Sequence, residues 1–174
     1  LWESRFSEGA LMGIFTRISV VPAQVVAAPF ALETQLDILR SMFLHGGWAH
    51  LIGNMLYLYL FGDNVEDRFG RPLFLLLYVA CGYAAVIAQV LIDASSEIPL
   101  VGASGAIAGV LGSYLVLFPS VRVRGLILLG LFSRLAEWPA WGVLALWFVI
   151  QLFSGFASLG PQMEGGVAFF AHIG

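Results

Sequence analysis

Residues 72–92 read PLFLLLYVACGYAAVIAQVLI, a stretch without a single acidic or basic side chain. A helix of about 20 apolar residues crosses the roughly 30 Å hydrocarbon core of a lipid bilayer. Residues 100–118 form a second stretch free of charged residues. Over all 174 residues, 60% are hydrophobic and 11% are charged, whereas soluble domains carry about 25% charged residues. The composition therefore predicts a membrane protein.

Length and charge together predict where the chain crosses the membrane. Pro22 and Pro29 interrupt the apolar residues 11–32, and prolines break a spanning helix, so we expect an interfacial loop there. We predict an all-α fold, a polytopic transmembrane helical bundle with four complete spans and the start of a fifth. The spans are expected at about residues 48–61, 72–92, 100–118 and 138–153, and from about residue 166.

Arginines between the expected spans predict the orientation of the bundle. Cytoplasmic connections of membrane proteins carry an excess of basic residues. Arg68 and Arg71 lie between the first and second spans, and Arg122, Arg124 and Arg134 lie between the third and fourth. We therefore expect both connections on the cytoplasmic side. The first, third and fifth spans would then all begin at the extracytoplasmic side, at one depth in the membrane.

Four side chains capable of acid–base or nucleophilic chemistry lie at these span beginnings: His50, Asn54, Ser104 and His172. Ionisable residues inside a membrane are costly and commonly functional. Four such residues on alternate spans, at one predicted depth, indicate a single site.

Ser104 lies in the small-residue stretch VGASGAIAGVLG, residues 101–112. A serine in a membrane helix often bonds its own helix, which is the structural alternative to a reactive role. Gly102, Gly105 and Gly109 keep bulky side chains away from its hydroxyl, and Gly105 and Gly109 allow another helix to approach closely. The stretch differs from the G-x-S-x-G turn of soluble hydrolases, because Ala106 replaces the last glycine and no strand precedes it.

A serine hydroxyl needs a neighbouring base to become a nucleophile at neutral pH. His172, in the apolar run VAFFAHIG, is the best candidate base among His45, His50 and His172. Its structural alternative is a histidine that bonds a backbone carbonyl or binds a ligand. Because the expected spans contain no Asp or Glu to orient the imidazole, we predict a Ser–His dyad rather than a triad.

His50 and Asn54 are four residues apart, so they share one face of a helix. Two donors that converge beside a nucleophile can stabilise an oxyanion, and the structural alternative is a hydrogen bond that packs two helices. His45, beside Gly46 and Gly47, is expected to be structural or interfacial.

The sequence also argues against several other classes. A net charge of -3 without lysine offers no basic surface for nucleic acid. No H-E-x-x-H or similar run is present, so we expect no metal and no cofactor. The single cysteine, Cys81, cannot form an internal disulfide. A small transporter would place ionisable groups along a path through several spans, not at one depth.

Three motifs together resemble the rhomboid intramembrane serine proteases. They are SMFLHGGWAHLIGNMLYLYLFGDNVEDRFG at residues 41–70, PLVGASGAIAGVLG at residues 99–112 and AHIG at residues 171–174. The combination of H-x-x-x-N, G-x-S-G and A-H-x-G in this order on alternate spans is highly specific.

The resemblance implies a role for each site residue. Ser104 would be the nucleophile and His172 its general base, while His50, Asn54 and the backbone N–H of Ser104 would hold the oxyanion. In many members an aromatic residue stacks on the catalytic histidine. This chain has Ala108 at the corresponding position. The substrates would be transmembrane proteins cut near the extracytoplasmic boundary. The alternative is a non-catalytic rhomboid-like protein that binds transmembrane helices.

The resemblance also implies how the chain is organised. Residues 1–174 would be a single rhomboid protease domain, incomplete at both ends, with an extracytoplasmic interfacial loop region over residues 1–41 and a transmembrane core over residues 42–174. The family's first span and most of its sixth would be missing. Residues 138–153 resemble the fifth span, the proposed lateral gate for substrates. Short connections suggest a multi-pass protein of a bacterial or archaeal plasma membrane.

Overall fold

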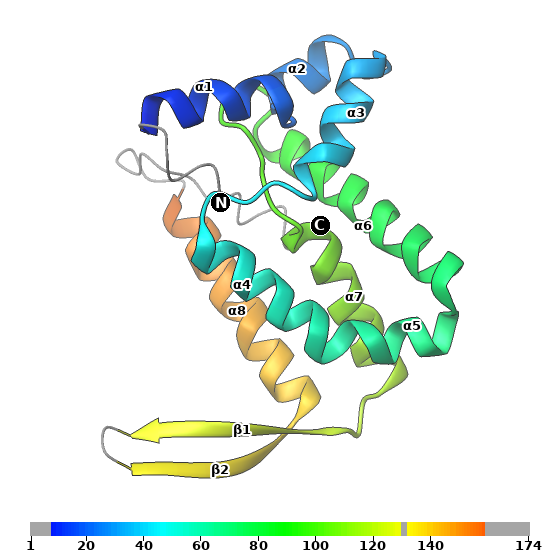
Figure 1. Ribbon diagram of the computed structural model, residues 1–174, viewed down its shortest axis with the longest axis vertical. Coiled ribbons are helices and arrows are strands. Elements are labelled where there is room, and N and C mark those ends of the chain that lie inside the picture. The colour runs from blue at the N-terminus through cyan, green and yellow to red at the C-terminus, as the bar shows by residue number, and fades with distance from the viewer. Residues whose placement is uncertain (1–7, 130–131, 159–174) are drawn as a thin grey trace.

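The structure is a computed structural model that describes residues 8–129 and 132–158. Its elements, in chain order, are α1 (Glu8–Ile18), α2 (Pro22–Ala27), α3 (Leu32–Ser41), α4 (Trp48–Tyr57), the π-helical segment η2 (Leu58–Gly62), α5 (Asp63–Phe69), α6 (Arg71–Ile92), α7 (Ser104–Leu117), β1 (Arg122–Leu129), β2 (Phe132–Pro139) and α8 (Ala140–Ser158). Figure 1 shows the longer helices as an elongated bundle, with α1 to α3 at one end and the β1–β2 hairpin at the other.

Hydropathy located the longest helix well. The stretch at residues 72–92 corresponds to α6 (Arg71–Ile92), which in the described part of the chain is the one helix long and apolar enough to cross a bilayer. Helix α7 and the first half of α8 are shorter apolar helices. The helical segment that contains the first expected span, residues 48–61, continues through η2 and α5 as far as Phe69. The number of spans remains a prediction, and the span expected from residue 166 lies outside the described residues.

The region before residue 42 contains three short helices instead of the loop that we expected. Pro22 occupies the first position of α2, where its missing N–H breaks no helical hydrogen bond. Pro29 lies in the turn between α2 and α3. Both prolines therefore interrupt the helix as predicted, and no continuous helix runs through residues 11–32.

An antiparallel hairpin makes the expectation of an all-α chain incomplete. Strands β1 and β2 pair in register from Arg122 opposite Pro139 to Leu129 opposite Phe132. The backbone N–H of Ala140 donates a hydrogen bond to the carbonyl of Val121 (2.8 Å), which closes the hairpin where α8 begins. The fold is therefore a mainly helical bundle with one hairpin between α7 and α8.

Helices α6 and α7 form the centre of the bundle and pack closely against each other. Gly109 of α7 faces Cys81 of α6, and a Cβ atom at Gly109 would overlap the Cys81 side chain. Ile107, Val110 and Leu111 of α7 are buried in the core. This packing holds α7, with Ser104 at its first position, in a fixed place relative to α6.

Candidate active site

Ser104 is the first residue of α7, after the N-cap residue Ala103. A serine within a helix can bond the carbonyl four residues earlier, and Ser113 of the same helix does so with Gly109 (2.9 Å). Ser104 has no preceding helical turn to bond. Its backbone N–H also belongs to the first turn, whose N–H groups have no partner within the helix. The hydroxyl and amide of Ser104 therefore both lie at an open helix end.

Gly102 shapes the turn that leads into Ser104. Its φ of 129° lies in a region that residues with a side chain rarely adopt. A Cβ atom at this position would lie 2.7 Å from both Cε1 and Nε2 of His50, and 3.4 Å from Oγ of Ser104. The His50 ring and the Ser104 hydroxyl therefore lie beside the same glycine.

His50 and Asn54 present polar atoms that the described part of the chain leaves unsatisfied. Both residues lie on α4, and Asn54 is 7% exposed. Nε2 of His50 and Nδ2 of Asn54 are buried, and among the residues that the structure describes neither has a hydrogen-bond partner. A buried unsatisfied polar group costs about 1–3 kcal/mol, so two neighbouring ones call for a functional explanation.

His45 contacts His50, although we expected it to be structural or interfacial and not part of the site. The two rings meet edge to face with their centroids 5.3 Å apart, and His45 is buried. His45 precedes the first residue of α4, so helical spacing could not have placed it beside His50. The imidazole of His50 thus lies against both the His45 ring and Gly102.

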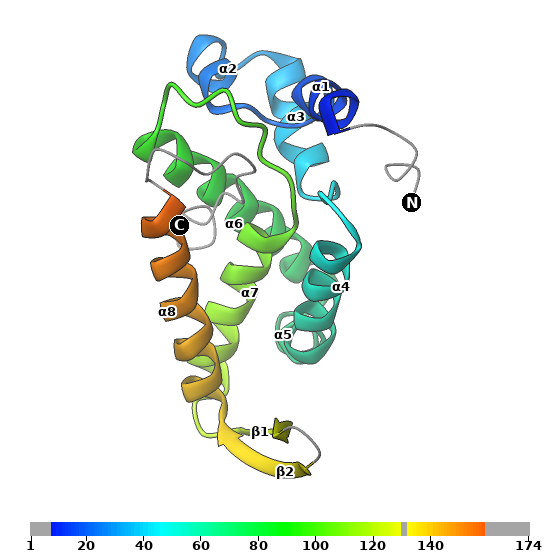
Figure 2. The same ribbon diagram turned by 90° about the vertical axis from the view of Figure 1, so that its left-hand side faces the viewer.

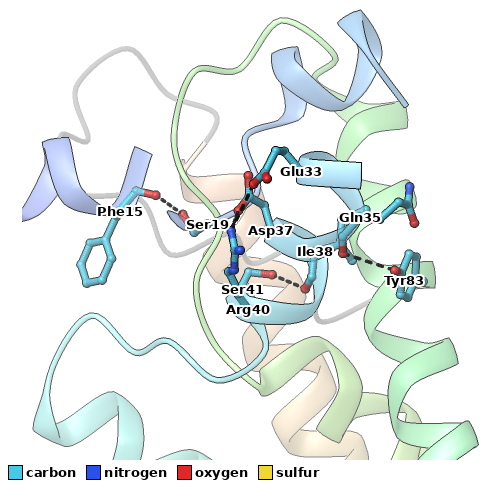
Figure 3. A network of polar contacts seen from close by, with 9 residues as sticks. All are labelled: Phe15, Ser19, Glu33, Gln35, Asp37, Ile38, Arg40, Ser41 and Tyr83. Carbon is cyan, nitrogen blue, oxygen red and sulfur yellow. Dashed lines mark hydrogen bonds and ion pairs between the residues drawn. The ribbon is translucent and has the colours of Figure 1, made fainter. Parts of the chain in front are cut away.

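The N-terminal helices hold the segment that precedes Ser104 through main-chain hydrogen bonds. The N–H of Leu100 donates to the carbonyl of Val20 (2.8 Å), and the N–H of Gly102 donates to the carbonyl of Ser41 (2.9 Å). Figure 3 shows that the Ser41 hydroxyl donates in turn to the carbonyl of Ile38 (2.7 Å). No sequence pattern indicated these supports, because any residue type can supply a main-chain carbonyl.

Of the remaining predicted site residues, the structure describes the two glycines of α7 but not the predicted base. His172, the predicted base, lies outside the described residues. Gly105 is the second residue of α7, and Gly109 faces Cys81. Across the ranges that the structure describes, no group of three His, Cys, Asp or Glu residues could hold a metal ion. The structure therefore brings together Ser104, Gly102 and His50, with Asn54 one helical turn beyond His50.

The family model and the curated relatives that the chain matches are all rhomboid proteins by name. The family model described as "Rhomboid domain" matches residues 33–174. The chain is 42% identical over 85 residues to "Rhomboid protease GluP" of Bacillus subtilis (strain 168), which covers 49% of this chain and 16% of that protein. It is 32% identical over 138 residues to "RHOMBOID-like protein 4" of Arabidopsis thaliana, which covers 79% of this chain and 30% of the relative.

A third relative is named as a mitochondrial protein. The chain is 32% identical over 96 residues to "Rhomboid protein 1, mitochondrial" of Saccharomyces cerevisiae (strain ATCC 204508 / S288c), which covers 53% of this chain and 28% of the relative. The chain thus spans 16% to 30% of the length of these three proteins. No solved structure matches the chain.

Proposed function

Because the chain belongs to the rhomboid family and is therefore part of an integral membrane protein, we propose that it carries the active site of an intramembrane serine endopeptidase. The observation that carries the proposal is a pair of buried atoms on α4, Nε2 of His50 and Nδ2 of Asn54, that have no hydrogen-bond partner among the described residues. His50 lies against Gly102, two residues before Ser104. An oxyanion formed at Ser104 would give both atoms a partner.

In the proposed reaction, the Oγ of Ser104 attacks the carbonyl carbon of a substrate peptide bond. His172 accepts the hydroxyl proton and later delivers it to the leaving amine. Water then hydrolyses the acyl-enzyme with His172 as the base. The position of Ser104 at the start of α7 supports this role, because its hydroxyl is not engaged by a preceding helical turn.

The negative charge that develops on the carbonyl oxygen would be held by three donors. These are the Nδ2 amide of Asn54, His50 with its proton on Nε2, and the backbone N–H of Ser104. The positive end of the α7 dipole adds to the stabilisation. Such donors act strongly because they are oriented before the reaction, and removing one typically costs about 10²–10³ in kcat.

The substrates of this enzyme would be membrane proteins with a transmembrane helix. A helix hides its peptide groups in internal hydrogen bonds, so the segment to be cut must unwind locally. Residues that weaken helices near the bond would make this easier. The arginine distribution supports cleavage near the extracytoplasmic boundary, in a bacterial or archaeal plasma membrane if the chain is prokaryotic. The mitochondrial relative makes an organellar membrane the alternative.

The decisive test uses the full-length protein in liposomes with a single-pass reporter substrate. Ser104→Ala and His172→Ala are expected to abolish cleavage. Ser113→Ala is the matched control in the same helix, because its hydroxyl bonds the carbonyl of Gly109, and it is expected to cut at the rate of the unaltered protein. Cleavage by Ser104→Ala at the unaltered rate would contradict the proposal. A protein that retains the reporter without cutting it would instead be a non-catalytic binder of transmembrane helices.

A further inference from the structure

We propose that the β1–β2 hairpin lies among lipid headgroups at the end of the bundle opposite Ser104, and that it binds anionic lipids through Arg122 and Arg124. The proposal does not depend on proteolysis. It rests on the place of the hairpin between two apolar helices, on the residue types along its strands and on the exposure of its basic and aromatic side chains.

The hairpin is fixed at the foot of the bundle by the chain itself. Helix α7 runs from Ser104 to Leu117, about 21 Å at 1.5 Å per residue, and the hairpin follows it directly. At the other end, the hydrogen bond from Ala140 to Val121 ties the hairpin base to the first residue of α8. Figures 1 and 2 show the two strands extending sideways below the helices. Two helices that cross the bilayer, as the sequence predicts for α7 and α8, would place the hairpin between them where they leave the membrane.

The hairpin has two ends of different composition. Its base, next to α7 and α8, carries Arg122 and Arg124, whereas its far end is apolar in sequence. Strand β1 reads RVRGLILL, with Arg122 and Arg124 first and four aliphatic residues at residues 126–129. Strand β2 begins with Phe132 opposite Leu129. An isolated two-stranded hairpin is at best marginally stable in water. Contact with lipid would stabilise a hairpin of this composition.

The backbone limits how deep the hairpin can lie. Within residues 8–129 and 132–158 each strand pairs on one side only, so its other edge carries N–H and C=O groups without a partner strand there. Unpaired backbone groups are not tolerated in the hydrocarbon core, where no water can bond them. The hairpin therefore lies flat at headgroup depth, where water and headgroups can satisfy the strand edges.

Charge and aromatic side chains at the hairpin base match an anionic lipid surface. Arg122 and Arg124 are two residues apart on one strand and so point to the same face, and both are exposed. Arg124 pairs with Glu137 (2.9 Å), but its side chain remains 80% exposed. Trp138 pairs with Val123 and so lies on the other face of the hairpin, where it is 48% exposed, and Trp141 near the start of α8 is 59% exposed. Tryptophan favours the membrane interface, and arginine binds phosphate with several N–H groups.

The overall charge of the hairpin favours anionic over neutral lipids. Residues 122–139 contain three arginines and one glutamate, a formal charge of 3 − 1 = +2. Each basic residue near an anionic membrane surface contributes about fivefold to binding. The loss of both Arg122 and Arg124 would therefore reduce the preference for anionic lipid by roughly 25- to 30-fold.

The experiment places a bimane fluorophore on Leu128→Cys in a Cys81→Ala background of the full-length protein. The labelled protein is reconstituted in vesicles of phosphatidylcholine and phosphatidylglycerol. Fluorescence is quenched from the lipid side by brominated acyl chains and from the water side by iodide. The same label on Glu97→Cys, in an exposed connection at the other end of the bundle, is the control for a site in water.

We expect brominated lipids to quench the label at residue 128 and iodide to quench it little, with the reverse at residue 97. Brominated phosphatidylglycerol should quench more than brominated phosphatidylcholine. The variant Arg122→Gln/Arg124→Gln should lose that difference, while Arg17→Gln, an exposed arginine on α1, should keep it. Quenching by iodide at residue 128 would overturn the proposal, as would protection from both quenchers, which would mean that the hairpin packs against protein. Equal quenching by the two lipids would overturn the assignment to anionic headgroups.

Discussion

Replacing Gly102 by alanine is expected to slow cleavage about 100-fold without unfolding the protein. The added Cβ would lie 2.7 Å from Cε1 and Nε2 of His50, whereas non-bonded carbon atoms prefer about 3.5–4.0 Å. Relief requires the His50 ring to move by roughly 1 Å, and a misplacement of that size can cost about 10² in rate. The φ of 129° adds strain of about 1–3 kcal/mol, which lowers the free energy of unfolding.

The assay measures cleavage of a single-pass reporter by the full-length protein in liposomes, over a range of reporter concentrations, so that kcat and KM are separated. We expect the loss in kcat, because His50 is proposed to act on the transition state. Gly112→Ala is the matched control, since no atom of the described residues lies within 4 Å of a Cβ at that position of α7. A folded Gly102→Ala protein with an unchanged kcat would refute the argument that Gly102 positions His50.

Three further substitutions test the donors and the packing of the bundle. His50→Ala and Asn54→Ala should each lower kcat by about 10²–10³ with little change in KM, whereas Asn64→Ala, an exposed asparagine that bonds Asp63, should cut normally; unchanged kcat in both would contradict an oxyanion role. Gly109→Ala should lower the free energy of unfolding by about 1–3 kcal/mol, measured by thermal unfolding in detergent, because its Cβ would overlap Cys81. Gly112→Ala should not destabilise the protein, and equal stability of the two variants would contradict the close packing of α6 and α7.

Hydropathy located α6 to within one residue because charged residues, Arg71 and Asp93, bound the apolar stretch on both sides. For α7, hydropathy predicted a start at residue 100, about four residues before the observed start at Ser104. Residues 100–103 are apolar or small, and hydropathy does not distinguish them from a helix. The helix begins at Ser104 because Gly102 turns the backbone with a positive φ, which depends on contacts with Ser41 and His50.

The hairpin is a second feature that hydropathy could not predict. Residues 126–129 are aliphatic, and a short apolar run cannot be assigned to a helix or a strand by its composition. The alternation of Arg122, Val123 and Arg124 is a strand pattern, but three residues are too few to decide it. The pairing with β2 is a tertiary feature.

The candidate site was predictable where the chemistry requires a residue type. The spacing of His50 and Asn54 predicts one helix face, and both residues do lie on α4 with unpartnered polar atoms in the described part of the chain. The supports around them were not predictable. The Ser41 carbonyl is a main-chain group, and the contact between His45 and His50 depends on how the chain enters α4.

The most direct test of the proposed nucleophile is covalent labelling with a serine-directed fluorophosphonate probe. The full-length protein is treated in liposomes and the modified residue is identified by mass analysis of its peptides. We expect modification of Ser104 that disappears in His172→Ala, because the hydroxyl needs its base to react. An unmodified Ser104, equal labelling of Ser113, or labelling of Ser104 that persists in His172→Ala would contradict this expectation.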